Sequence, residues 1–183
     1  IAHEGTPEAL REGFKYFLFN VAGAGFLFLG IGLIVAYTGT GEFAGVAKGF
    51  ASLSPAVGTS IMILMAVGFC MKAAQVSLRI DWQRHPALAP TPVSGYISSV
   101  LLKIAVFGLV KLFLVFGSVY AQSPDTAGLF SQQAVMYATA WIGAFTLLYS
   151  AVQAMLQNSL KLVFIWSTVS QIGYMVLGVA VGT

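Results

Sequence analysis

Five long runs of largely apolar residues constrain this sequence more than any other feature. They cover residues 14–37, 55–78, 95–121, 133–156 and 162–181, and short polar or proline-containing stretches separate them. An apolar helix of about 20 residues is long enough to cross the hydrocarbon core of a bilayer. The sequence therefore predicts an all-α, polytopic transmembrane bundle of about five spanning helices, which form a single membrane domain over residues 1–183.

Charge is too scarce for a surface that faces water. Only 8% of the residues are charged and 58% are hydrophobic, whereas a soluble domain carries about 25% charged residues. The net charge of +3 does not indicate nucleic-acid binding, because nine Lys and Arg scattered over an apolar chain form no basic patch. The expected partner is a lipid bilayer, in a bacterial or archaeal plasma membrane or an energy-transducing organelle membrane.

The first span has start and stop signals. Thr6 can cap the helix, Pro7 suits its first position, and Glu8 suits the positive end of the helix dipole. The loop at 38–41 ends the helix, and residues 45–53 are expected to form a short interfacial segment. Because the chain lacks an initiator Met and a signal-peptide pattern, we expect it to be an internal part of a longer chain.

Loop charges predict an orientation. With five spans, one side of the membrane holds only Lys48, and the other holds a group of basic residues: Arg11, Lys15, Arg79, Arg84 and Lys161. Basic loops stay in the cytoplasm, so the N-terminal end is expected on the cytoplasmic side and the C-terminal end outside.

Lysines lie inside the predicted spans. Lys72 is in the second span, and Lys103 and Lys111 are on either side of the middle of the third. A lysine at the bilayer centre costs about 2.5–3.5 kcal/mol on insertion scales. The long side chain can reach the interface instead, and Lys111 is the most open to that reading. For Lys72 and Lys103 we favour a functional role.

Polar residues recur at helical spacing around these lysines, because residues three and four apart are neighbours on a helix. Such a stripe is often only a hydrogen-bonded seam between helices, but four of them suggest a hydrated polar line through the bundle. The stripes are Lys72, Gln75 and Arg79; Tyr96, Ser99 and Lys103; Gln153, Gln157 and Lys161; and Ser167, Ser170, Gln171 and Tyr174.

The chemistry expected of this line is proton transfer. No Asp or Glu lies within a span, and a buried amine without a counter-charge releases its proton more readily than one in water, which an arginine cannot do. His85, in the loop after the second span, could pass protons at a channel mouth, although a loop histidine is more often solvated or capping. No catalytic pair, cofactor ligand or metal-ligand spacing is visible, and Cys70 is the sole cysteine.

Four ordered motifs resemble the antiporter-like subunits of respiratory complex I, multi-subunit Na⁺/H⁺ antiporters and membrane-bound hydrogenases. Phe14–Phe17 (FKYF) resembles the family's "ALKYF", and GFCMKAAQ at 68–75 resembles its lysine-bearing helix. APTPVSG at 89–95, followed by Lys103, resembles the next helix. QNSLK at 157–161 with STVSQIGY at 167–174 resembles its "QxDLKRLLAYSTVSQIGY" signature.

The resemblance implies that the chain is part of a larger membrane complex. The family's fold contains inverted repeats of helices, a common transporter design, and this chain resembles its middle. The resemblance implies that Lys72 pairs with a glutamate on an upstream helix outside this chain, and that Lys103 continues the proton line. It also implies other membrane subunits as partners.

The predicted function is therefore that of a proton-translocating, antiporter-like subunit. The predicted proton pathway comprises Lys72, Lys103, Lys161, His85 and Lys111. Two alternatives stay open: a stand-alone Na⁺/H⁺ transporter and an architectural membrane subunit. Na⁺ requires oxygen ligands, and these spans supply only hydroxyls and amides, which weakens a Na⁺ site within this chain.

Overall fold

Helices make up every regular element in the part of the chain that the structure, a computed structural model, describes: residues 5–50, 53–78, 89–120 and 132–182. Five of them are long and apolar enough to cross a membrane, which confirms the predicted all-α polytopic bundle. The elements are α1 (Pro7–Thr38), α2 (Phe43–Phe50), α3 (Pro55–Lys72), α5 (Thr91–Tyr96), the π-helical segment η3 (Ile97–Leu101), α6 (Leu102–Tyr120), α7 (Gln132–Met155) and α8 (Leu160–Gly182).

The ends of α1 form as the sequence predicts. The hydroxyl of Thr6 accepts a hydrogen bond of 3.2 Å from the backbone N–H of Ala9. At the other end, Gly39 adopts a left-handed conformation with φ of 72° and its N–H bonds to the carbonyl of Val35, a conformation that glycine adopts without a steric penalty. The chain then turns directly into α2.

Glycines let α1 and α3 approach closely. A Cβ added at Gly68 of α3 would lie 3.0 Å from the carbonyl oxygen of Gly23 in α1, and one added at Gly30 would lie 2.5 Å from Cγ of Met65. Much of the remaining surface of α1 consists of exposed large apolar side chains such as Phe28. We interpret this surface as facing lipid or other helices.

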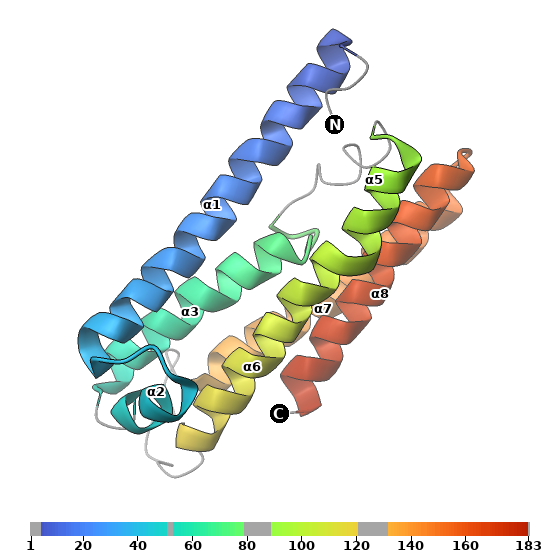
Figure 1. The fold of residues 1–183 in the computed structure, drawn as a ribbon. Coiled ribbons are helices and arrows are strands. Elements are labelled where there is room, and N and C mark those ends of the chain that lie inside the picture. The colour runs from blue at the N-terminus through green and yellow to red at the C-terminus, as the bar shows by residue number, and fades with distance from the viewer. Residues whose placement is uncertain (1–4, 51–52, 79–88, 121–131, 183) are drawn as a thin grey trace.

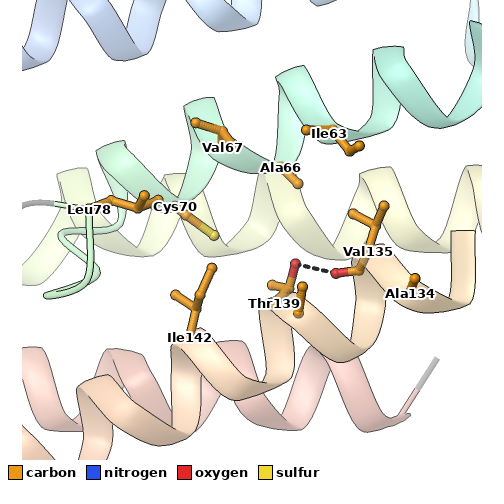
Figure 2. Close-up of a pocket in the computed structure, with 10 residues that line it drawn as sticks. Ile63, Ala66, Val67, Cys70, Leu78, Ala134, Val135, Thr139 and Ile142 are labelled. Atoms are coloured by element: carbon orange, nitrogen blue, oxygen red, sulfur yellow. Dashed lines mark hydrogen bonds between the residues drawn. The ribbon is translucent and has the colours of Figure 1, made fainter. Parts of the chain in front are cut away.

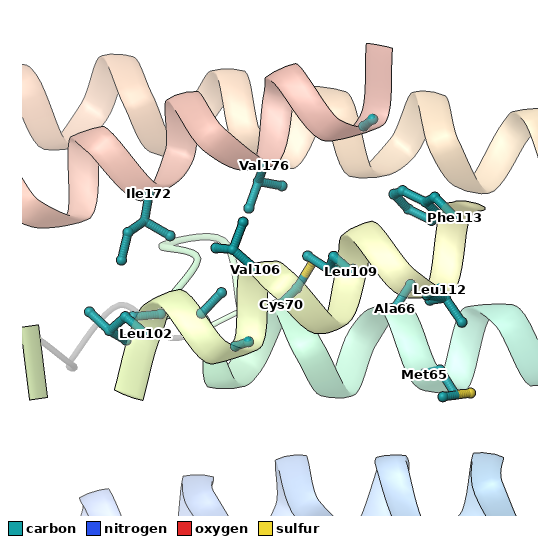
Figure 3. Packing of buried hydrophobic residues seen from close by; sticks show 14 of the residues in the cluster. Met65, Ala66, Cys70, Leu102, Val106, Leu109, Leu112, Phe113, Ile172 and Val176 are labelled. Carbon is teal, nitrogen blue, oxygen red and sulfur yellow. The ribbon is translucent and has the colours of Figure 1, made fainter. Parts of the chain in front are cut away.

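The long helix formed by α5, η3 and α6 runs through the middle of the bundle. These three elements follow one another without a gap (Figure 1). Figure 3 shows α6 between α3 and α8, where Leu109 and Phe113 are fully buried together with Ile172 of α8. The apolar core of the molecule therefore surrounds α6.

The tightest pair of helices is α7 and α8, which form an antiparallel hairpin. A Cβ added at Gly173 would lie 2.6 Å from the backbone nitrogen of Leu147, and one added at Gly143 would lie 2.9 Å from the carbonyl of Gly173. The two backbones are in direct contact, so only glycine fits at these two positions.

Two predicted boundaries need correction. The second span was predicted to run to residue 78, but α3 ends at Lys72. The third span was predicted from residue 95, but its helix begins at Thr91 because Pro92 occupies a first-turn position, where a missing N–H does no harm. Figure 1 shows the start of α1 and the end of α8 at opposite ends of the bundle, as an odd number of spans requires.

Candidate functional site

The end of α3 is the first irregular point in the bundle. Ala74 adopts φ of 54°, a left-handed conformation, and its own N–H and that of Gln75 bond back to the helix. The N–H of Gln75 bonds to the carbonyl of Cys70 at 3.1 Å, and that of Ala74 bonds to Met71 at 3.3 Å. These two bonds satisfy carbonyls that a helix end leaves free. Lys72 is therefore the last helical residue.

Lys72 is half-buried and lies at the level of the middle of α1. A Cβ added at Gly23 would lie 3.6 Å from Cγ of Lys72, and Gly23 is close to the middle of α1. Gly23 is eight residues, or roughly 12 Å along the axis of α1, from Lys15. The ammonium of Lys15 pairs with the buried carboxylate of Glu12 at 3.0 Å. The 18 residues of α3 are about 27 Å long, less than the roughly 30 Å of a hydrocarbon core.

A buried polar group follows Lys72. Gln75 is fully buried, its amide nitrogen donates to the carbonyl of Ala73 at 3.4 Å, and its Oε1 has no hydrogen-bond partner among the described residues. The predicted helical stripe through Lys72 and Gln75 is therefore wrong in its geometry, because Gln75 stands in the turn beyond the helix. The third member of that stripe, Arg79, lies outside the described residues.

The turn after α3 is held by α7. The backbone N–H of Val76 donates to the hydroxyl of Thr146 at 3.1 Å. One turn farther along α7, Ser150 is fully buried, and its hydroxyl has no partner among the described residues. Sequence reasoning missed both residues, although Thr139, Thr146 and Ser150 recur at helical spacing within an apolar helix, which was the available signal.

Lys103 follows a second irregular point. In η3 the N–H of Leu102 bonds to the carbonyl of Ile97, five residues back, so one extra residue is inserted into the helix. The ammonium of Lys103, which is half-buried, donates to the carbonyl of Ser98 within this segment. Lys103 is the central residue of the Thr91–Val115 span, and so lies near the middle of the membrane.

The π-helical segment divides the stripe predicted around Lys103. Tyr96 is 55% exposed, and Ser99 is exposed with its hydroxyl 3.5 Å from the carbonyl of Tyr96. The extra residue in η3 rotates the preceding turn relative to α6. Tyr96 and Ser99 therefore face the outside of the described bundle, while Lys103 is half-buried.

In α8 the predicted polar residues point in different directions. Ser170 is buried and its hydroxyl donates to the carbonyl of Leu147 in α7 at 3.2 Å. Gln171 and Tyr174 are exposed on the described chain. The structure thus brings only Ser170 into the interior, on the face where α8 meets α7.

Lys161 and Gln157 lie at the turn between α7 and α8. The amide of Gln157 donates to the carbonyl of Gln153 at 3.1 Å. The ammonium of Lys161 donates at 2.6 Å to the carbonyl of Ala89, a residue 72 positions away that stands before α5. Lys161 is therefore tied to the start of the helix that carries Lys103.

Lys111 stands apart from the other lysines. It is exposed, and its ammonium lies 5.5 Å from the ring centroid of Phe107 on its own helix. It borders a cleft of about 420 Å³ between α1, α2, α3 and α6 whose other lining residues are overwhelmingly apolar. This position fits the snorkelling interpretation at least as well as a place in the interior line.

A second cavity, of about 260 Å³, separates α3 from α7 (Figure 2). Its lining is apolar except for Thr139 and Cys70. The hydroxyl of Thr139 already donates to the carbonyl of Val135 at 2.8 Å. The polar groups that join α3 to α7 are therefore concentrated at the end of α3. His85, the remaining predicted residue, lies outside the described residues.

Comparison with known proteins places these features in a family. The family model described as "NADH:quinone oxidoreductase/Mrp antiporter, TM" matches residues 2–183. Together with the five apolar helices, this match makes the chain a multi-pass integral membrane protein.

Curated relatives match over almost the whole chain. NADH-quinone oxidoreductase subunit L of Mycobacterium tuberculosis is 36% identical over 96% of this chain and 26% of the relative. Subunit N 1 of Acidiphilium cryptum is 30% identical over 94% of this chain and 34% of the relative. The chloroplastic NAD(P)H-quinone oxidoreductase subunit 5 of Cryptomeria japonica is 30% identical over 96% and 23%. The chain thus spans about a quarter to a third of the length of these relatives.

Proposed function

Because the chain belongs to the NADH:quinone oxidoreductase/Mrp antiporter transmembrane family, we propose that it forms the central part of a proton-translocating, antiporter-like subunit. Its partners would be the other membrane subunits of a multi-subunit complex. Lys72 and Lys103 carry the protons, and redox chemistry takes place in partner subunits. The relatives are named as oxidoreductase subunits, which supports this assignment.

The observation that carries the proposal is the setting of the two lysines. Each stands beside an irregular turn: Lys72 at the end of α3 and Lys103 directly after η3. Irregular backbone inside a membrane is tolerated where it is buried in protein or lines a polar cavity, and transporters place their sites at such points. The negative end of the α3 dipole also lies at Lys72, where it attracts an ammonium.

Buried polar atoms around the end of α3 support a hydrated path. Gln75 Oε1 and Ser150 Oγ are buried without partners among the described residues, and such atoms are typically satisfied by internal water. Thr146 and Ser170 add hydroxyls on α7 and α8. Protons would pass between lysines through water and these groups, because the separate side chains cannot form a continuous chain of bonds themselves.

The proposal includes an orientation and an ion. The N-terminal end lies on the cytoplasmic side, because basic residues predominate at that side of the five spans. Protons are favoured over Na⁺ because the described spans present hydroxyls, amides and lysines near the site, and their buried carboxylate, Glu12, pairs with Lys15 instead. Na⁺ needs several oxygen ligands.

The test is proton translocation by the assembled complex in sealed membrane vesicles, followed with a pH-sensitive dye. We expect Lys72→Ala and Lys103→Ala each to abolish most of the proton gradient, since neither alanine can bind a proton. Lys48→Ala, which changes an exposed lysine on α2, is the matched control and should pump normally. Normal pumping by both Lys72→Ala and Lys103→Ala would refute the proposal and favour an architectural role.

A further inference from the structure

We infer that Lys161 is a positioning residue: its ammonium holds the start of the α5–η3–α6 helix, and with it Lys103, and does not itself relay protons. The inference deepens the proposed function, on which it rests for the role of Lys103. It departs from the prediction, made from helical spacing, that Lys161 is a member of the proton line.

The contact that carries the inference is made to a buried backbone carbonyl. Ala89 is 2% exposed, and its carbonyl accepts from Lys161 at 2.6 Å and from the hydroxyl of Ser94 at 3.3 Å. The same hydroxyl lies 3.2 Å from the carbonyl of Pro90. The Ala89 carbonyl precedes α5 and so belongs to no helix ladder, and a buried carbonyl of this kind needs a donor. Lys161 supplies a charged one.

The helix dipole does not favour Lys161 at its position on α8. It is the second residue of α8, at the positive end of the helix dipole, where a cation is disfavoured. The hydrogen bond to Ala89 offsets that disadvantage. Lys161 thus lies at the end of α8 that is unfavourable for a cation, and its ammonium bonds to a different segment, as a residue that links two elements would.

Two prolines lie at the start of α5. Pro90 and Pro92 have no N–H, so two of the residues around the first turn cannot donate a hydrogen bond. The helix then continues without interruption through η3 to Lys103, about 18 Å along its axis from Thr91. Because α5, η3 and α6 form one continuous helix, a displacement of the start of α5 changes the position of Lys103.

Replacing Lys161 with arginine distinguishes a positioning role of this residue from a role in relaying protons. A link to a carbonyl needs only a donor, which a guanidinium supplies, whereas a relay must release its proton, which an arginine does not do. Lys161→Arg should therefore pump if Lys161 positions and fail if it relays. Lys161→Met removes the donor and keeps the apolar length of the side chain, so it should fail in either case.

The experiment uses the assembled complex in membranes, with proton translocation and amide hydrogen exchange of residues 90–101 as separate readouts. We expect Lys161→Met to lose most translocation and to exchange roughly 10- to 150-fold faster at the start of α5, the loss expected for a hydrogen bond to a charged group. Lys161→Arg should resemble the unmodified protein in both readouts.

Two results would overturn the inference: loss of pumping in Lys161→Arg with normal exchange, or normal exchange in Lys161→Met. If Lys161→Met does not assemble, Lys161→Arg decides alone, because the relay reading predicts an assembled complex that does not pump. Lys103→Arg separates this question from the proposed function. Normal pumping in Lys103→Arg would contradict the relay role of Lys103, and the exchange data would still decide whether Lys161 holds the helix.

Discussion

At the residue scale, the polar interior depends on single contacts that cross between helices. Thr146 is fully buried, and its hydroxyl accepts the N–H of Val76 at the turn that follows Lys72. A buried N–H of this kind needs an acceptor, and the hydroxyl of Thr146 provides it. One threonine on α7 therefore fixes the direction in which the chain leaves α3.

We predict that Thr146→Val destabilises the protein by about 1–3 kcal/mol, because it leaves a buried N–H without an acceptor. Thr139→Val is the matched control: Thr139 is also buried on α7, but its hydroxyl bonds only to the carbonyl of Val135 on the same helix. The measurement is the thermal unfolding midpoint in detergent. Equal midpoints for the two variants would contradict the assigned role of Thr146.

The intramembrane lysines could be found from the sequence alone, because a charge in an apolar run is visible without coordinates. Their settings could not. Nothing in the sequence around Ala73, Ala74 and Gln75 marks a helix end, since there is no glycine or proline, and the left-handed Ala74 is stabilised by tertiary contacts. The π-helical turn before Lys103 likewise left no sequence pattern that periodicity could detect, so the Tyr96–Ser99–Lys103 stripe was placed on one face.

At the element scale, the α7–α8 hairpin depends on two glycines that bring backbones together. Gly143 and Gly173 face each other, and each would place a Cβ within 3 Å of the other helix. Close approach of this kind lets van der Waals contact between helices replace contact with lipid. The buried hydroxyl of Ser170, bonded to Leu147, lies on the same interface.

We predict that Gly173→Ala destabilises the hairpin by about 1–3 kcal/mol or more, because the added methyl meets backbone atoms that cannot move aside. Gly178→Ala, on the same helix with nothing within 4 Å of the added Cβ, should be neutral or more stable by up to about 1 kcal/mol from helix propensity. Unfolding by a denaturing detergent gives both values. The interface assignment fails if Gly173→Ala is as stable as Gly178→Ala.

The sequence predicts the presence of each spanning helix well, but it predicts where the helices end less well. Runs of apolar residues are sufficient to identify spans, and the fourth and fifth helices lie within two residues of the expected limits. Thr6 and Gly39 mark α1 because their side-chain and backbone chemistry acts locally. The end of α3 depends instead on Thr146, a residue 70 positions away, which no local pattern could reveal.

At the scale of the whole molecule, the five spans place the turn between α7 and α8 on the same side as the start of α1 (Figure 1). Lys48 on α2 lies at the other end of the bundle, after α1 has crossed. Both Lys48 and Asn158, in the α7–α8 turn, are exposed, so they can report the two sides of the membrane.

We predict that a membrane-impermeant maleimide labels Asn158→Cys only from the cytoplasmic side and Lys48→Cys only from the opposite side. A Cys70→Ala background removes the native thiol, which is buried and so reacts poorly in any case. Intact cells present the outer side of the membrane to the reagent, and inverted vesicles present the cytoplasmic side. The reverse labelling pattern would invert the proposed orientation.

The bond between Val76 and Thr146 also has a consequence for biosynthesis. Its two partners are 70 residues apart, so at about 5–20 residues per second a ribosome needs roughly four to fourteen seconds to make the second after the first. During that interval the nascent turn beyond Lys72 is without the acceptor that completes it. The turn beyond Lys72 is completed only when the α7–α8 hairpin docks, so a chain terminated before α7 would leave this turn without its acceptor.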